Sequence, residues 1–227
     1  MSDPSPPSVS LFVTCLADLI RPSVAFASIR LLEQAGCIVD VPVQQTCCGQ
    51  PGYNSGDYES TVPIAKKTIA LFEHAQFVVA PSGSCAGMLT EHYPKLLEGE
   101  WQERAIALAE KTYELTSFLA DVVKLDKAPA ILTQMPTVTY HDSCAGLREL
   151  GIKEQPRKLL RELCEVDIKE MQQADVCCGF GGTFCAKMPD ISGKMVDDKL
   201  RDAVATGAGM ITGGDLGCLL NIAGRAR

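Results

Sequence analysis

Short apolar runs alternate with amphipathic stretches along the chain. Residues 8–15 (SVSLFVTC) are apolar and β-branched, which predicts a strand that ends at Cys15. After Pro22, apolar residues recur at helical spacing as far as Gly36, which predicts a helix over 22–35. The same reasoning predicts the rest of the first half: a strand at 37–43, the loop TCCGQPG, a helix at 61–75, a strand at 77–83 and a helix that opens at Cys85.

The second half of the chain repeats this order of elements. TVTYHDSC predicts a strand, QPRKLLREL a helix, and VDIKEMQ a strand that leads into VCCGFGG. Residues 192–206 predict a helix that Gly207 ends, MITGG a short strand, and CLLNIAGRA a terminal helix. Each half therefore has the pattern βαβαβα.

The cysteines repeat together with these elements. Cys15, Cys47, Cys48 and Cys85 recur as Cys144, Cys177, Cys178 and Cys218, at offsets of 129, 130, 130 and 133 residues. The intervening stretches are 31 and 36 residues long in the first half and 32 and 39 in the second. We interpret this agreement as an internal repeat.

The repeat predicts an α/β protein of two tandem, pseudo-symmetric βαβαβα units, each with a small parallel sheet. Residues 95–127 are mostly helical in pattern, and LDKAPAILTQMPT has the composition of a linker. We therefore predict a first cysteine-rich domain with a helical extension over 1–134 and a second cysteine-rich domain over 135–227.

All eight repeated cysteines fall where a strand ends and a helix begins. Ligands bind at this edge of parallel sheets, because the carboxyl ends of the strands meet there. Folding of each unit is thus expected to gather four thiols, although they are spread over about 70 residues of sequence. Glycines beside them, such as Gly49 and Gly179, would let the backbone pass close to a bulky cofactor.

Composition and charge narrow the function classes. The chain has 28 acidic and 21 basic residues, and its net charge of -7 argues against nucleic acid or an anionic membrane as a partner. The N-terminal segment lacks the features of a secretory signal, and no apolar run is long enough to span a bilayer. We expect a cytoplasmic location, where the 11 cysteines indicate metal sites more than disulfides.

Four thiolates per unit suit iron–sulfur clusters or zinc. Adjacent cysteines without a spacer are atypical of zinc sites, which use pairs separated by two to four residues, so the spacing favours iron–sulfur. Two alternatives stay open. One is a zinc-stabilised interaction scaffold, and the other is a thiol–disulfide oxidoreductase that uses the vicinal cysteines.

Long motifs around these cysteines resemble a known family. They are CCGQPGYNSG, PSGSCAGMLTEHYP, HDSCAGLRELGIKEQPR, CCGFGGTFCAKMPDISGKMVDDK and GGDLGCLLNIAGR. They resemble the cysteine-rich (CCG) domain family, which includes one of the heterodisulfide reductase subunits and the glycolate oxidase iron–sulfur subunit, and most closely its lactate-utilisation branch. The resemblance implies two tandem cysteine-rich domains, iron–sulfur clusters, and oxidation of L-lactate to pyruvate together with partner subunits.

The sequence departs from the wider family pattern at one position of each unit. That pattern ends in Cys-x-x-Cys, whereas here Met88 and Asn221 replace the last cysteine. The departure argues against a five-cysteine noncubane cluster and leaves a conventional 4Fe-4S cluster, one or two per chain. Cys185 is a candidate spare ligand, whereas Cys37 and Cys164 are predicted to pack at the opposite edge of the sheets.

Histidines and aspartates near the cysteines are secondary candidates. His141 precedes Cys144 by three residues, so it could orient a thiolate, relay a proton, touch substrate or make a structural hydrogen bond. Asp142 and Asp215 flank cluster cysteines and could cap helices. His74 and His92 are predicted to be surface or capping residues.

These observations lead to one functional hypothesis. The chain is expected to be the iron–sulfur, electron-transferring subunit of an oxidoreductase complex, with other lactate-utilisation subunits as partners. No G-x-G-x-x-G motif stands in a strand–helix context, so no flavin or nicotinamide site is evident. Either a partner holds the small 2-hydroxy acid substrate, which we expect, or a cluster with an open iron coordinates the hydroxy acid directly.

Overall fold

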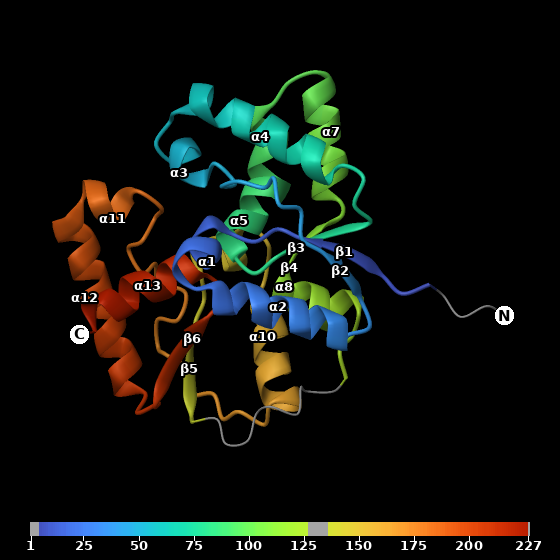
Figure 1. Cartoon of the computed structure of the whole chain (residues 1–227). Helices are drawn as coiled ribbons and strands as arrows, with labels where there is room; N and C mark the ends of the chain where they lie inside the picture. Colours follow the sequence, from blue (N-terminus) through green and yellow to red (C-terminus); the bar gives the residue numbers. More distant parts are fainter. Residues whose placement is uncertain (1–4, 127–135, 227) are drawn as a thin grey trace.

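A parallel four-stranded sheet forms the centre of the first half (Figure 1). The computed structural model describes residues 5–126 and 136–226. The strands are β1 (Ser8–Leu11), β2 (Ile38–Asp40), β3 (Phe77–Ala80) and β4 (Thr112–Glu114), in the order β2-β1-β3-β4. All three pairings are parallel, as the alternation of strands and helices predicts.

Helices cover both faces of this sheet (Figure 1). On one face lie α4 (Tyr58–Phe72) and α7 (Glu100–Ala109), and on the other lie α2 (Pro22–Gln34) and α8 (Leu115–Ser117), which continues into the π-helical turn η2 (Phe118–Val122). Successive strand residues enter opposite cores, since Val78 and Ala80 pack with Phe72 whereas Val79 packs with Leu32.

Short helices at the carboxyl edge of the sheet complete the first half. They are α1 (Cys15–Ile20), α3 (Gln50–Tyr53), α5 (Gly83–Gly87) and α6 (Tyr93–Leu96), with the π-helical turn η1 (Met88–His92) between the last two. Of these, α1 begins with a repeated cysteine, α3 follows the vicinal pair, and α5 contains the fourth.

The second half repeats the plan with a smaller sheet. β5 (Val138–His141) pairs with β6 (Met210–Gly213) in parallel. The helices are α9 (Cys144–Arg148), α10 (Glu154–Lys158) with its π-helical continuation η3 (Leu159–Leu163), α11 (Phe184–Lys187), α12 (Pro189–Ala205) and α13 (Leu216–Arg225).

The predicted fold class is confirmed, with three local differences. The strand predicted at VDIKEMQ is reduced to one bridge, between Ile168 and Val138. β4 was missed because it has three residues, too few for an alternating pattern, and forms by pairing with β3. The strand predicted to end at Cys15 ends at Leu11, and Cys15 opens a helix instead. Residues 127–135 of the predicted linker, and with them the domain boundary predicted between residues 134 and 135, lie outside the described residues.

The two halves meet where α5 crosses α9. A Cβ atom added to Gly83 would lie 2.9 Å from the Gly146 backbone nitrogen and Cα, so the close approach requires glycine at position 83. The Gly83 N–H also donates to the Gly214 carbonyl over 3.1 Å. These contacts bring the cysteine-bearing edges of both sheets together.

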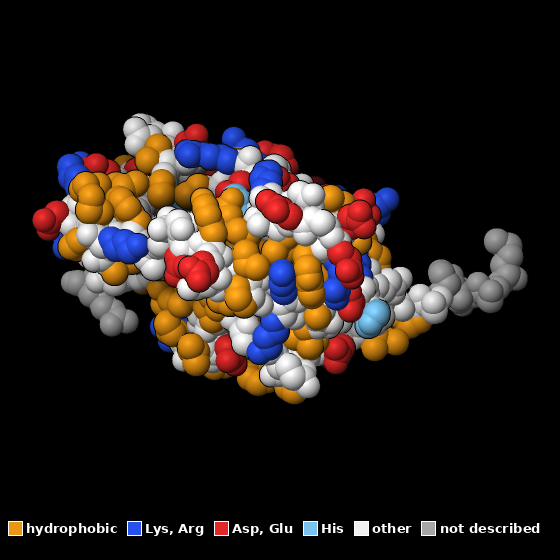
Figure 2. All heavy atoms as spheres, turned by 90° about the horizontal axis from the view of Figure 1, so that it is seen from above, with side chains coloured by type: hydrophobic (Ala, Val, Ile, Leu, Met, Phe, Trp, Pro, Cys, Tyr) orange, Lys and Arg blue, Asp and Glu red, His pale blue; other side chains and the backbone are white. Residues whose placement is uncertain are grey.

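Charged side chains of both signs are interspersed with apolar ones on the face above α4 and α7 (Figure 2). No single sign of charge dominates this face. Within the described part of the chain, no helix combines the length and the apolar character that crossing a membrane requires.

Candidate metal centres

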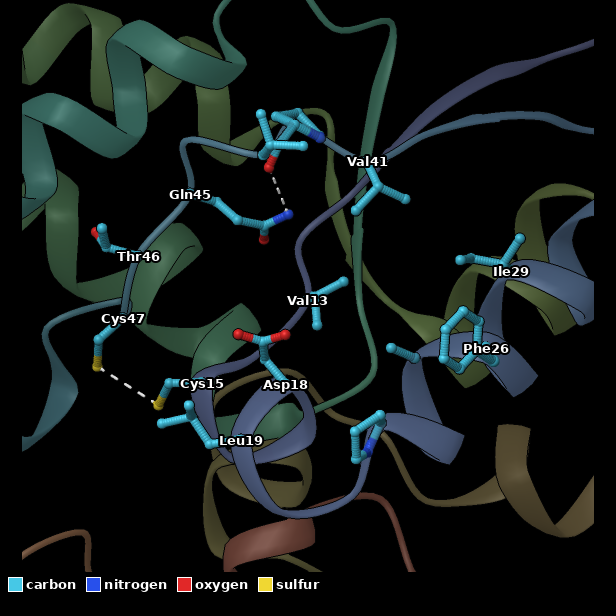
Figure 3. Close-up of a pocket in the computed structure, with 14 residues that line it drawn as sticks. Val13, Cys15, Asp18, Leu19, Phe26, Ile29, Val41, Gln45, Thr46 and Cys47 are labelled. Carbon is cyan, nitrogen blue, oxygen red and sulfur yellow. Dashed lines mark hydrogen bonds between the residues drawn. The ribbon is translucent and has the colours of Figure 1, made fainter.

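The fold brings the first four repeated cysteines together. The Cys15 and Cys47 sulfurs are 3.8 Å apart, and the Cys48 and Cys85 sulfurs are 3.5 Å apart. The side chains of Cys47 and Cys48 also interact, which links the two pairs. We call these four residues the first quartet. Figure 3 shows the Cys15 and Cys47 sulfurs turned toward one another from separate segments.

The second quartet, Cys144, Cys177, Cys178 and Cys218, has the same arrangement. The Cys144 and Cys177 sulfurs are 3.6 Å apart. The Cys178 and Cys218 sulfurs lie within 4.8 Å of each other and of a ring nitrogen of His141. Each quartet thus has one buried pair, one half-buried pair and sulfurs close enough to share one metal centre.

Capping residues fix the helices that carry the cysteines. The Thr14 and Ser143 hydroxyls accept hydrogen bonds from the first turns of α1 and α9, directly before Cys15 and Cys144. Ser82 and Asp215 cap α5 and α13 in the same way, three residues before Cys85 and Cys218. Ser, Thr and Asp are the residue types that satisfy free helix amides best, so the sequence specifies each cysteine position locally.

The glycine of each CCG segment has a definite role. Gly49 and Gly179 adopt φ of 85° and 81°, a left-handed conformation that other residues rarely take. Their N–H groups donate to the Cys47 and Cys177 sulfurs over 3.4 and 3.3 Å. The turn therefore places an amide donor against a sulfur, an interaction that stabilises a thiolate.

Thiols within each quartet perturb one another. Hydrogen bonds from Cys15 and then Cys48 hold the pKa of Cys47 well below its usual value. In the second quartet, hydrogen bonds from Cys144 and Cys178 lower the pKa of Cys177. The same contacts raise the pKa of Cys15 and Cys144, so each quartet stabilises one thiolate, and a cation would be needed to deprotonate the remaining thiols.

A cavity of about 280 Å³ lies against the first quartet. All four of its cysteines line it, and the second half of the chain contributes Phe180, Asp215 and Gly217. Beside it, a groove of about 430 Å³ begins at Cys15 and Cys47 (Figure 3). The cavity is large enough for a group of several atoms, and the donor set of four thiols fits a soft metal cluster.

Among the described residues that line them, neither space has a cationic side chain. The groove walls are mostly apolar, with Val13, Phe26 and Val41, and Asp18 is the acidic residue in them (Figure 3). The cavity likewise has Asp215 as its charged residue. A carboxylate ligand would therefore meet negative charge and no positive partner in either space.

His141 and Asp142 occupy different environments. His141 is fully buried, and burial lowers its pKa to about 4. Asp142 is not a helix cap, since both of its carboxylate oxygens accept hydrogen bonds from Arg157, over 2.8 and 3.0 Å. Asp215 does cap α13, as predicted, and accepts a hydrogen bond from Gly217 N–H over 3.1 Å.

Met88 and Asn221, which stand where the family pattern has a fifth cysteine, make structural contacts. Met88 is fully buried in the core of the first half. The Asn221 side-chain amide donates to the Cys178 carbonyl over 3.0 Å. Tyr93 makes the corresponding contact in the first half, from its hydroxyl to the Cys48 carbonyl over 2.8 Å. These contacts fix the backbone of the vicinal cysteines.

The remaining cysteines lie apart from this arrangement. Cys37 is buried in the core formed by α2 and η2, as predicted for a packing residue. Cys164 is half-buried in an apolar pocket beside η3. The Cys185 sulfur contacts the Gly182 carbonyl at 3.8 Å and borders a separate shallow pocket.

The other two histidines differ from each other. His74 is a surface residue, with a side chain that is 92% exposed. His92 was expected at the surface or as a cap, yet it is mostly buried between the halves. Its ring stacks near Tyr53 and its Nε2 lies 3.3 Å from Glu149, a contact that forms only when the halves pack.

Phe180 was not singled out from the sequence. It packs with Cys178 and Cys218 and also lines the cavity of the first quartet, so it lies between the two centres. The one available signal was its place in CCGFGG, where the first half has CCGQPG.

Comparisons with known proteins follow the same division of the chain. The CCG family model, described as a cysteine-rich domain, matches residues 9–90 and again 138–223. Lactate utilization protein A 2 of Bacillus cereus (strain Q1) is 47% identical over 221 residues, which cover 96% of this chain and 90% of that protein. Lactate utilization protein A of Geobacillus sp. (strain WCH70) is 48% identical over 96% of this chain and 92% of its own length.

Proposed function

Because the chain belongs to the family of cysteine-rich CCG domain proteins, alongside the lactate utilization A proteins, we propose that it is an iron–sulfur subunit of a lactate-utilising oxidoreductase complex. In this proposal it works in the cytoplasm and passes electrons from L-lactate, which partner subunits oxidise to pyruvate. The names of the relatives support the substrate, and the cysteine quartets support the cofactor.

The observation that carries the proposal is the convergence of the sulfurs. Four thiols meet in each half, from segments far apart in sequence, and four thiolates are the ligand set of a cubane 4Fe-4S cluster. The proposed ligands are Cys15, Cys47, Cys48, Cys85, Cys144, Cys177, Cys178 and Cys218, which gives one or two clusters per chain. A bound cluster would supply one-electron transfer.

The protein groups around each quartet suit this role. Gly49 and Gly179 amides donate to sulfur, which lowers the negative charge that a reduced centre must carry. Phe180 packs against the second quartet and adds an apolar side chain to the lining of the first cavity.

Substrate oxidation is assigned to a partner for a physical reason. In the part of the chain that the structure describes, the spaces beside the first quartet are lined by Asp18 and Asp215 and by no lysine or arginine. Lactate is an anion, and a site that binds it needs a cationic or strongly donating group. We therefore place the lactate site on another subunit.

The buried positions of Cys48 and Cys178 weigh against the thiol–disulfide alternative. Their exposed fractions are 2% and 0%, so a vicinal pair that exchanges with an outside disulfide has only one accessible sulfur. The zinc-stabilised scaffold would bind zinc in place of iron and sulfide, and it would have no redox activity.

The experiment that tests the function uses the complex isolated without oxygen together with its partner subunits. On addition of L-lactate, the visible absorption of the clusters should bleach, and the bleaching should be faster than with glycolate. Partner subunits alone should take the two electrons of lactate only onto a redox group of their own, and should neither turn over nor reduce an added acceptor. A colourless chain with stoichiometric zinc, or a brown chain that lactate with partners never reduces, would contradict the proposal.

A further inference from the structure

The two centres differ at one position of their shared plan. Phe12 and His141 each lie three residues before the first cysteine of a quartet; Phe12 directly follows β1, and His141 is the last residue of β5. The repeat offset of 129 residues that relates Cys15 to Cys144 also relates Phe12 to His141. Phe12 belongs to the apolar core that includes Cys48 and Cys85. A phenyl ring in the first half is therefore replaced by an imidazole in the second.

The surroundings of His141 do not satisfy its ring. The residue is 0% exposed, and within the described chain neither Nδ1 nor Nε2 has a hydrogen-bond partner. A buried polar atom without a partner is costly and rare in native proteins, so it requires an explanation such as a bound group. One ring nitrogen lies within 4.8 Å of both the Cys178 and the Cys218 sulfurs, so the missing partner is expected at the second quartet.

We propose that His141 is an additional nitrogen ligand of the iron–sulfur centre held by the second quartet, so that one iron of that centre carries both a thiolate and the imidazole, which makes the two centres of this protein chemically different. This inference rests on the proposed function, because it requires iron at the quartets. Neutral imidazole is a good ligand for iron and combines with cysteine thiolates in known clusters. The first quartet has only Phe12 at this place and remains a four-thiolate centre.

A second difference between the two halves also favours reduction of the second centre. Gly49 faces Thr61 and Ile64, and Gly179 faces Ser192 and Met195, so α4 and α12 correspond at an offset of 131 residues. At this offset Lys199 stands where the first half has Thr68. Lys199 is 3% exposed, and its ammonium donates to the Gln173 and Ala174 carbonyls beside the vicinal cysteines.

The two centres are therefore expected to differ in reduction potential. A neutral nitrogen ligand adds no negative charge to the cluster, and a buried ammonium nearby favours the more negative reduced state. The second centre should therefore have the higher reduction potential and receive electrons from the first.

The ligand is tested by labelling the nitrogen. The chain contains three histidines, so protein grown with ¹⁵N-histidine in otherwise unlabelled medium has few labelled rings. Anaerobically loaded C15S/C48S protein, which retains only the second quartet, is reduced and examined by electron–nuclear double resonance. We expect one strongly coupled ¹⁵N nucleus, lost in the added H141F change and kept in H74F, whose ring is on the surface.

A redox titration of the full chain gives an independent readout. H141F should leave the first centre unchanged and shift the potential of the second centre to a more negative value. Full iron and sulfide loading without a strongly coupled histidine nitrogen would overturn the inference and leave the proposed function intact. Absence of iron and sulfide from both quartets would overturn the proposed function and this inference with it. The labelled protein with an intact His141 decides the ligand even if H141F fails to fold.

Discussion

The Ser82 hydroxyl donates a hydrogen bond to the Asp215 carboxylate over 3.0 Å, and these two residues cap equivalent helices in the two halves. The Ser84 N–H donates to the same carboxylate oxygen, also over 3.0 Å. The N-cap residues of α5 and α13 are therefore hydrogen-bonded to each other, three residues before Cys85 and Cys218. Each proposed centre is thus positioned in part by the other half of the chain.

Replacement of Asp215 should weaken both halves. Asp215→Ala removes the cap of α13 and leaves Ser82 and Ser84 with one acceptor fewer, and we expect a loss of about 2–3 kcal/mol in the free energy of unfolding. Asp215→Asn keeps an acceptor oxygen and should cost less than half as much. Urea denaturation of the metal-free protein measures both variants. Equal stability of Asp215→Ala and the wild type would contradict the role of this contact.

The glycine of each CCG segment gives a second prediction. Gly49→Ala and Gly179→Ala combine left-handed backbone strain with crowding, since the added Cβ would lie 3.1 Å from Thr61 Cγ2 or 3.0 Å from the Ser192 carbonyl oxygen. We expect each to lose about 2 kcal/mol or more of stability, measured by urea denaturation. Each should also lower the iron content of its own quartet.

Gly56→Ala is the matched control for these changes. Gly56 also has a positive φ, of 76°, but nothing lies within 4 Å of the position that an added Cβ would take, so this change introduces strain without crowding. It should cost about 1 kcal/mol and leave the iron content unchanged. Loss of iron from Gly56→Ala to the same extent would show that strain alone, and not the geometry at the sulfur, controls loading.

Glu114 should give the protein a distinct pH dependence. Its carboxyl is fully buried, and burial raises its pKa from 4.5 to about 7 despite hydrogen bonds from Thr116 and Ser117. The folded state then binds a proton more tightly than the unfolded state, so its contribution to stability is present below pH 4.5 and is lost as the pH rises to about 7. The size of this loss is up to about 3 kcal/mol.

The difference between wild type and Glu114→Gln isolates this effect. The variant keeps a side-chain oxygen for the Thr116 and Ser117 amides but does not titrate. Urea unfolding between about pH 4.5 and 8 should show the wild type losing stability relative to the variant as the pH rises. Parallel pH profiles for the two proteins would exclude a raised pKa of Glu114.

The buried ion pair between Arg157 and Asp142 supports the strand end next to His141. Arg157→Met should cost about 3–5 kcal/mol, because it leaves the Asp142 carboxylate buried and unpaired. The double change Arg157→Met with Asp142→Asn should recover part of that loss. Thermal unfolding of the single and double variants checks this, and a single variant as stable as the wild type would contradict it.

The fold class and the convergence of the cysteines could be predicted from the sequence, because both depend on local patterns. Apolar runs and caps at Thr14, Ser143 and Asp215 specify where each cysteine meets the edge of a sheet. The repeated spacing of the CCG segments predicts the positions of the vicinal cysteines, because equal spacing in two equivalent folds places them at equivalent points.

Features that depend on packing between the halves were not accessible in this way. His92 is buried by Glu149 of the other half, and Phe180 reaches a cavity whose cysteines lie more than 90 residues away in sequence. Periodicity and spacing carry no information about such contacts, because they arise after each unit has folded.

The most direct test of the central claim is the content of iron and acid-labile sulfide per chain in protein prepared without oxygen. We predict a brown wild-type protein with equal amounts of iron and sulfide. C48S should lose the share of the first quartet, C178S should lose the share of the second, and C37A should retain both. A folded wild-type chain without iron, or a content that none of the quartet changes lowers, would contradict the account.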